Sequence, residues 1–180
     1  ASGTIKTKNQ YQVFSSANGI VDQVLVKEGD LIKRGAPIIR LANSTVELTA
    51  ENARIAAEYS SVAANTEKLT ELKNNIDLAK SKMDNDALLL ERQRNLWAQQ
   101  IGTRNELDQR ELAYRTSLNA FEASKLRYAE LQKQISFQAK QSQKNLQISK
   151  STARDYLIKS EQERKVYSIY KEKGEMVNTQ

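Results

Sequence analysis

Apolar residues recur every seven positions through the middle of the chain. A strict seven-residue repeat is typical of a left-handed coiled coil. The repeat weakens beyond Ile135 to Ser142 and Ser149, so we expect looser packing there. The first stretch of the stripe holds Leu48, Ile55, Val62, Leu69, Ile76, Met83, Leu90 and Trp97, and the second holds Leu107, Tyr114, Phe121, Tyr128 and Ile135.

The two stretches mirror each other about Gly102. Folding the chain there sets Trp97 opposite Leu107 and Leu90 opposite Tyr114, and every pair is equidistant from Gly102. We therefore predict an antiparallel α-helical hairpin over 44–155, with arms at about 44–101 and 103–153 and a tip at Gly102. At about 1.5 Å per residue, each arm would extend roughly 75–85 Å. The other pairs are Met83 with Phe121, Ile76 with Tyr128, and Leu69 with Ile135.

Helix breakers and caps agree with this hairpin. Between Pro37 and Gly174, Gly102 is the only glycine or proline, and strong helix formers dominate. Gly102 suits the left-handed residue that ends the first helix. Ser44-Thr-Val-Glu47 and Thr103-Arg-Asn-Glu106 have the capping-box pattern of a helix start.

Charge differs between the bases of the two arms. Residues 45–71 are rich in glutamate, whereas their mirror partners at 133–157 carry lysine and arginine. This favours antiparallel pairing, although each exposed pair is worth under about 1 kcal/mol. Two solvated faces of opposite sign explain the pattern equally well.

The two flanks of the helical region repeat each other and read as short strands. Each copy has a strand, an acidic-glycine turn and an apolar pair, and the copies would form two halves of one small β domain. Sliding by 145 positions aligns Val21 with Val166, Val24 with Ile169, Gly29 with Gly174, Asp30 with Glu175, Leu31 with Met176, and Ile32 with Val177.

Composition limits the chemistry. Apolar content is 39% and aromatic content 6%, which suits a narrow coiled-coil seam better than a compact core. There is no His and no Cys, so the usual zinc ligands and the commonest general base are missing. We predict no catalytic site, no metal and no cofactor. No apolar run could span a membrane, and the chain begins without Met. We expect a fragment whose membrane anchor lies elsewhere.

A split β domain with an inserted helical hairpin resembles the periplasmic adaptor, or membrane fusion, family of bacterial tripartite efflux and secretion systems. The stretch 19–38 is similar to the first half of a lipoyl (biotinyl-like) module, and 165–177 is similar to the second. The resemblance implies a mostly α fold in which a two-helix coiled coil is inserted between lipoyl halves at 1–43 and 156–180. Residues 1–9 would be a strand of a β-barrel domain that is otherwise absent.

The most specific match lies at the tip. Family members that dock onto TolC-like channels carry Arg, then Leu four residues on, then Ser or Thr seven further, as Arg92, Leu96 and Thr103 do here. The resemblance implies that Arg92 bonds backbone carbonyls, Leu96 makes an apolar contact and Thr103 supplies a hydroxyl. Ile101 and Gly102 are further candidates. Thr103 is also a helix cap, and Leu96 could belong to the hairpin core.

The resemblance implies a non-catalytic periplasmic adaptor between an inner-membrane ABC or RND transporter and a TolC-like outer-membrane channel. The transporter would bind domains mostly outside this chain, which would hold the inner-membrane anchor, and full-length subunits would form a trimeric or hexameric ring. No nucleic acid is expected. The segment Leu41–Ser44 lacks the lysine that carrier modules modify, so lipoylation and biotinylation are not expected. The alternative is a cytoplasmic coiled-coil tether or scaffold with no transport role.

Overall fold

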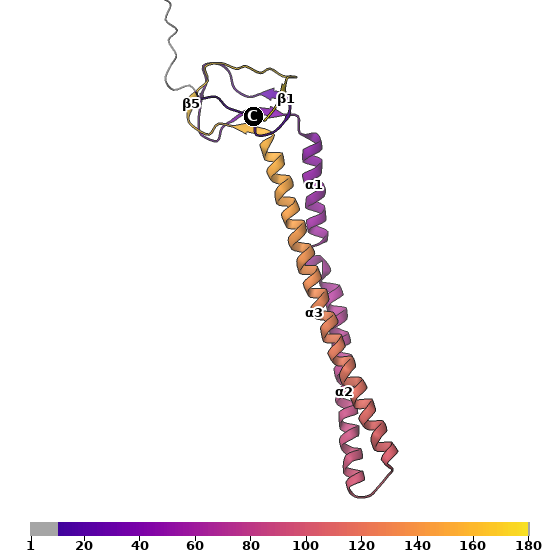
Figure 1. Ribbon diagram of the computed structural model, residues 1–180. Helices are drawn as coiled ribbons and strands as arrows, with labels where there is room; N and C mark the ends of the chain where they lie inside the picture. Colours follow the sequence, from indigo (N-terminus) through magenta and orange to yellow (C-terminus); the bar gives the residue numbers. More distant parts are fainter. Residues whose placement is uncertain (1–10, 180) are drawn as a thin grey trace, which may run out of the picture. The chain divides into compact units, whose positions relative to one another are not determined.

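A computed structural model describes residues 11–179 (Figure 1). The chain is mostly helical with a small β part, which confirms the predicted fold class. The candidate strand at 1–9 lies outside the described residues. The helical elements are α1 (Ser44–Tyr59), the 3₁₀ turn η1 (Ala63–Asn65), α2 (Thr66–Ala98) and α3 (Arg104–Asp155); the strands are β1 (Gly19–Val24), β2 (Leu31–Ile32), β3 (Pro37–Leu41), β4 (Leu157–Lys159), β5 (Arg164–Lys165) and β6 (Met176–Val177).

The chain divides into two compact units, described in turn. The β unit comprises Ala1–Arg54 and Lys144–Gln180, and the hairpin unit comprises Ile55–Gln143. Within the described part of the chain, no helix is both long and apolar enough to cross a membrane.

The β unit is assembled from both flanks of the helical region. Its four-stranded sheet has the order β4-β3-β1-β6, and β2 pairs with β5 in a second, two-stranded sheet. Strands from before the helices thus pair with strands from after them in both sheets, so the helical region is an insertion, as predicted. The core is formed by Ala17, Val21, Leu41 and Ile158.

The flank repeat is visible as matching turns in the β unit. Gly29 and Gly174 have the same φ of +93°. In the first turn, the Lys27 amide donates to the Asp30 carboxylate at 2.8 Å, and in the second, the Glu172 amide donates to the Glu175 carboxylate at 3.1 Å. Asp30 and Glu175, at equivalent positions of the two copies, therefore close equivalent turns in the same way, which gives the repeat a structural basis.

The two copies also pair with each other reciprocally. The Val21 amide donates to the Glu175 carbonyl and the Val166 amide to the Asp30 carbonyl, both at 2.8 Å. This is the pairing expected of two halves related by an internal two-fold. Strand β5 ends at Lys165. Just after it, the Val166 carbonyl accepts from the Gly29 amide at 2.8 Å, and the Ile169 amide donates to the Glu28 carboxylate at 3.1 Å.

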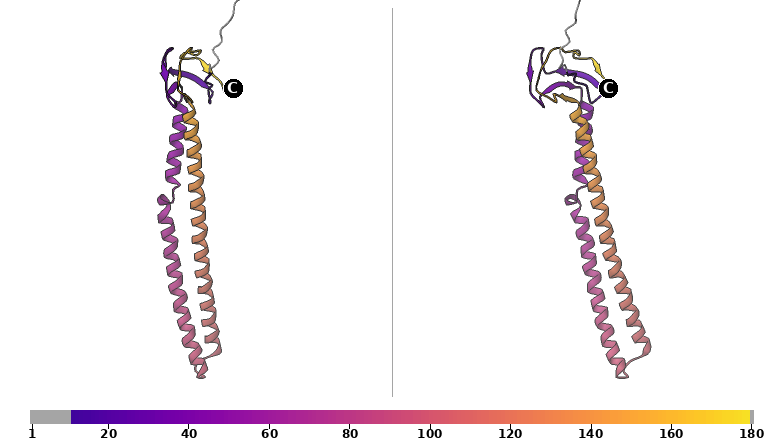
Figure 2. Two further views of the ribbon diagram at one scale, coloured as in Figure 1. Left: turned by 90° about the vertical axis from the view of Figure 1, so that its left-hand side faces the viewer. Right: turned by 60° about the vertical axis from the view of Figure 1, so that its left-hand side comes forward.

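The hairpin unit contains the antiparallel helices α2 and α3 (Figure 2). Leu90, Leu107 and Ile135 from the predicted stripe are each only 4% exposed, which is the burial expected of a coiled-coil seam. The ion pair between Arg94 and Glu111, 3.6 Å apart, joins the two helices. Its two positions are symmetric about Gly102 to within one residue, as the mirror pattern predicts.

The sequence predicts a single continuous helix for the first arm, and this prediction is wrong. The arm is broken between α1 and α2, where polar side chains bind the backbone. The Asn65 amide group donates to the carbonyls of Tyr59 at 3.1 Å and Ser61 at 2.9 Å, and the Ser61 hydroxyl accepts from the Ala64 amide at 3.1 Å. Such bonds compete with the helical ladder, and neither glycine nor proline is needed.

The break changes which face of the first arm is buried. Ala57 is the buried residue of α1, whereas the three stripe residues before α2 are exposed. The prediction that the stripe is a core over its whole length is therefore wrong for its first three positions. Those positions are Leu48, Ile55 and Val62.

The capping box predicted from Ser44 is also displaced. Ser44 is already helical, and the Glu47 amide donates to the Asn43 carbonyl at 2.9 Å. The Asn43 side-chain amide donates to the Glu47 carboxylate. Asn43 therefore flanks the helix start, one residue earlier than predicted, because an asparagine can take the same position.

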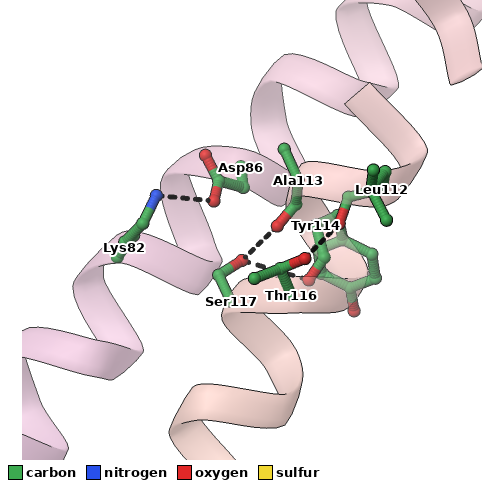
Figure 3. Close-up of polar contacts among 7 residues, drawn as sticks. All are labelled: Lys82, Asp86, Leu112, Ala113, Tyr114, Thr116 and Ser117. Atoms are coloured by element: carbon green, nitrogen blue, oxygen red, sulfur yellow. Dashed lines mark hydrogen bonds and ion pairs between the residues drawn. The ribbon is translucent and has the colours of Figure 1, made fainter. Parts of the chain in front are cut away.

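A charged group lies in the seam of the hairpin unit (Figure 3). Asp86 is 7% exposed, and the Lys82 ammonium donates to its carboxylate at 3.1 Å. The pKa of Asp86 is lowered mainly by the hydrogen bond from Lys82, with the charges of Lys82 and Arg110 assisting, while burial opposes them. The Ser117 hydroxyl opposite donates within its own helix, to the carbonyls of Ala113 at 3.1 Å and Tyr114 at 3.0 Å. Asp86 is therefore held ionised at a position that a coiled coil normally fills with an apolar side chain.

Candidate functional site: the hairpin tip

The tip begins with a tightly hydrogen-bonded helix end. After α2 ends at Ala98, the Ile101 amide donates to the Leu96 carbonyl and the Gln100 amide to the Trp97 carbonyl, both at 2.9 Å. These two bonds make a Schellman motif, whose left-handed residue is usually glycine. Here that residue is Gln100, with φ of +61°. The prediction that Gly102 takes this position is therefore wrong.

Gly102 is a second left-handed residue, with φ of +89°. A Cβ atom there would lie 2.8 Å from a Glu106 carboxylate oxygen and 3.1 Å from the Gln93 side-chain nitrogen. The two nearby atoms are ends of flexible side chains that can move aside, so it is the left-handed backbone conformation that favours glycine at this position. It lets the chain pass close to the start of α3.

The capping box at Thr103 forms as predicted. The Thr103 amide donates to the Glu106 carboxylate at 2.7 Å, and the Glu106 amide donates to the Thr103 hydroxyl oxygen at 3.2 Å. The hydroxyl is used as an acceptor, and no acceptor for its own proton is found among residues 11–179. Thr103 can therefore cap α3 and still donate a hydrogen bond outward.

Arg92 and Leu96 lie one helical turn apart near the end of α2, and both are exposed. Within the described residues, Arg92 makes no ion pair or hydrogen bond. Its neighbours differ, because Arg94 pairs with Glu111 and Arg104 pairs with Asp108 at 2.9 Å. Arg92 is thus the tip arginine whose guanidinium is available to a partner.

Two large apolar side chains are exposed next to Leu96. Ile101, in the turn, is 51% exposed, and Trp97 is 39% exposed, close to the 40% of Leu96. The stripe had placed Trp97 in the core. The sequence signal for its exposure is its position: Trp97 is the last stripe residue of the first arm, and α2 ends one residue later. The tip therefore combines an unpaired cation, a hydroxyl donor and an apolar group.

The tip has the chemistry of a binding surface. Within residues 11–179, no group of three or more His, Cys, Asp or Glu side chains is arranged to hold a metal ion. The tip exposes hydrogen-bond donors and apolar side chains, and the backbone amides of residues 99–101 are hydrogen-bonded to carbonyls of the preceding helix end.

Solved structures share this fold. The periplasmic adaptor protein EmrA superposes with a TM-score of 0.52 at 15% identity, over 97% of this chain and 70% of EmrA. MacA from Actinobacillus actinomycetemcomitans superposes with a TM-score of 0.53 at 20% identity, over 96% of this chain. No protein-family model and no curated protein sequence matches the chain. The predicted resemblance to periplasmic adaptors is thus confirmed at the level of the fold.

The chain spans 46% of the MacA chain. Both superpositions cover nearly all of this chain, so the β unit and the helical region each have counterparts in these structures.

Proposed function

We propose that this chain belongs to a non-catalytic periplasmic adaptor that connects an inner-membrane transporter to a TolC-like outer-membrane channel in efflux or type I secretion. The hairpin tip docks onto the channel. The observation that carries the proposal is the tip itself, where Arg92, Leu96 and Thr103 are all exposed at the end of a hairpin inserted into a β domain.

Each tip residue has a role that its surroundings support. The Arg92 guanidinium is unpaired within the described chain and would bind carbonyl or carboxylate oxygens, which it can reach with several donors. Leu96 would lose exposed apolar area on contact. Thr103 would donate its hydroxyl proton while it continues to cap α3. Ile101 would widen the apolar contact, and Gly102 would allow the close approach of the turn to the helix start.

The β unit would act as a lipoyl-type module without its prosthetic group. Its internal repeat supports this assignment, and the connection from β3 to α1, Leu41–Ser44, contains no lysine. A transporter of the ABC or RND type would bind through domains outside this chain, and the full-length subunits would form a ring of three or six. We place the protein in the periplasm, where EmrA, which shares its fold, is an adaptor.

The docking proposal is tested by binding of the chain to a purified TolC-type channel. Arg92→Asp and Leu96→Ser should each weaken binding about tenfold or more, because one removes the free cation and the other the apolar contact. The controls are Arg127→Asp and Leu78→Ser, which change exposed residues of the same types farther from the tip. Unchanged binding by both tip variants would refute the assignment of the docking site.

Thr103 needs variants that separate its two roles. Thr103→Ser retains the cap and the donor, whereas Thr103→Asp retains the cap but has no proton to donate and adds a negative charge. We expect similar thermal stability for both variants and weaker channel binding for Thr103→Asp alone. Equal binding by the two would restrict Thr103 to capping.

A further inference from the structure

Trp97 is the one residue of the apolar stripe in α2 that the hairpin leaves substantially exposed at the tip. Leu90, one heptad earlier, is 4% exposed, and so is Leu107, which mirrors Trp97 about Gly102. Trp97 is 39% exposed. The seam therefore covers Leu107 at the level of Trp97 but leaves 39% of the Trp97 surface exposed to solvent.

The backbone that carries Trp97 is fixed by its own hydrogen bonds. The Trp97 carbonyl accepts from the Gln100 amide, and the Leu96 carbonyl accepts from the amides of Gln99 at 3.0 Å and Ile101 at 2.9 Å. A partner would thus meet the exposed side chains of Leu96, Trp97 and Ile101 on a turn that is already ordered. Preordering of this kind lowers the entropy cost of binding.

Polar groups around these side chains are mainly free donors. The indole N–H, the Arg92 guanidinium and the Thr103 hydroxyl have no acceptor among the described residues. Three of the carboxylates nearby are engaged, since Glu106 binds the Thr103 amide, Glu111 binds Arg94 and Asp108 binds Arg104. Glu91, next to Arg92 in the sequence, is exposed and has no partner among the described residues. The matching surface is apolar and bordered by acceptor oxygens, as at the C-terminal ends of helices, where carbonyls lack partners.

We propose that Trp97 is the main apolar anchor of the tip and inserts into a shallow apolar pocket at helix ends of the docked channel. The inference rests on the proposed docking function and adds a residue outside the pattern of Arg92, Leu96 and Thr103. Tryptophan is among the residues that most often dominate binding energy at the centre of an interface. Its ring buries a large area while its N–H satisfies an acceptor.

The chain has one tryptophan, which makes the test specific to this residue. The chain is labelled with 5-fluorotryptophan, and its single ¹⁹F resonance is followed as an unlabelled TolC-type channel in detergent is added. On docking, we expect the resonance to shift and to lose its relaxation enhancement by a soluble gadolinium chelate. If the chelate still reaches the ring when sedimentation shows the chain bound, the anchor is refuted.

Affinity supplies the second readout. Trp97→Ala should weaken channel binding at least about tenfold, which corresponds to about 1.4 kcal/mol. The control is Leu78→Ala, an exposed apolar residue of the same helix farther from the tip, which should change binding less than about twofold. Circular dichroism verifies that both variants keep their helices. Equal affinities of Trp97→Ala and the unmodified chain refute the anchor alone, whereas no binding by the unmodified chain refutes docking itself.

Discussion

Two stretches of the first arm, Ser44–Tyr59 and Thr66–Ala98, carry the same seven-residue apolar stripe but bury different faces. In α2 the stripe is half-buried or buried as far as Leu90, which is 4% exposed. In α1 the stripe faces solvent, and the buried residue is an alanine, Ala57, at 2% exposure. The difference arises at the break between them, where Asn65 and Ser61 bond the backbone. A heptad pattern therefore predicts a seam only as far as the helix remains continuous.

The largest expected loss of stability comes from shortening a stripe residue in α2, and the equivalent substitution in α1 is its control. Leu90→Ala should lower the free energy of unfolding by about 3 kcal/mol, because it removes a buried leucine from the seam. Ile55→Ala, at a stripe position that is 52% exposed, should cost less than about 1 kcal/mol. Urea denaturation followed by circular dichroism measures both. Similar losses would mean that α1 buries the stripe as α2 does.

The buried carboxylate tests the seam of α2 in another way. Because the pKa of Asp86 is lower in the folded chain than in the unfolded one, the ionised form stabilises the fold. This contribution is complete above the ordinary pKa of an aspartate and is lost as pH falls through the folded-state value. Asp86→Asn should cost about 1–2 kcal/mol at neutral pH.

The measurement is the free energy of unfolding of both proteins between neutral and strongly acidic pH. The difference between them should shrink as the medium becomes acidic, since the unmodified chain then loses its charge at Asp86. Asp84→Asn is the control, because that carboxylate also binds a lysine, Lys80 at 2.6 Å, but is exposed. A difference that stays constant across the pH range would show that the Asp86 charge adds no stability.

The smallest effect is expected at the break itself. Asn65→Ala removes the amide that satisfies the carbonyls of Tyr59 and Ser61, and should cost about 1 kcal/mol. Hydrogen exchange should become faster at residues 60–66 and stay unchanged near Leu90. An increase in helicity and stability would contradict this expectation. It would mean that α1 and α2 join into one helix when Asn65 is replaced.

At the tip, the sequence predicts local structure where local chemistry suffices: the Thr103–Glu106 capping box depends on residues three positions apart, and it forms. Arg92, Leu96 and Thr103 are exposed, and their docking role stays a prediction. The exposure of Trp97 did not follow, because its heptad position says nothing about whether a partner side chain covers it. The left-handed conformation of Gln100 was missed as well, since glycine is the usual residue there.

By itself, the sequence determined the helical hairpin, its reversal near Gly102 and the repeat of the β unit. Each is encoded in short-range patterns: helix formers, a capping box, and two acidic-glycine turns that form alike at Gly29 and Gly174. Tertiary structure decided which face of α1 is buried, that Asp86 remains charged within the seam, and that Trp97 is exposed. These depend on what lies opposite each side chain in three dimensions, and burial is a property of that neighbourhood and not of the residue.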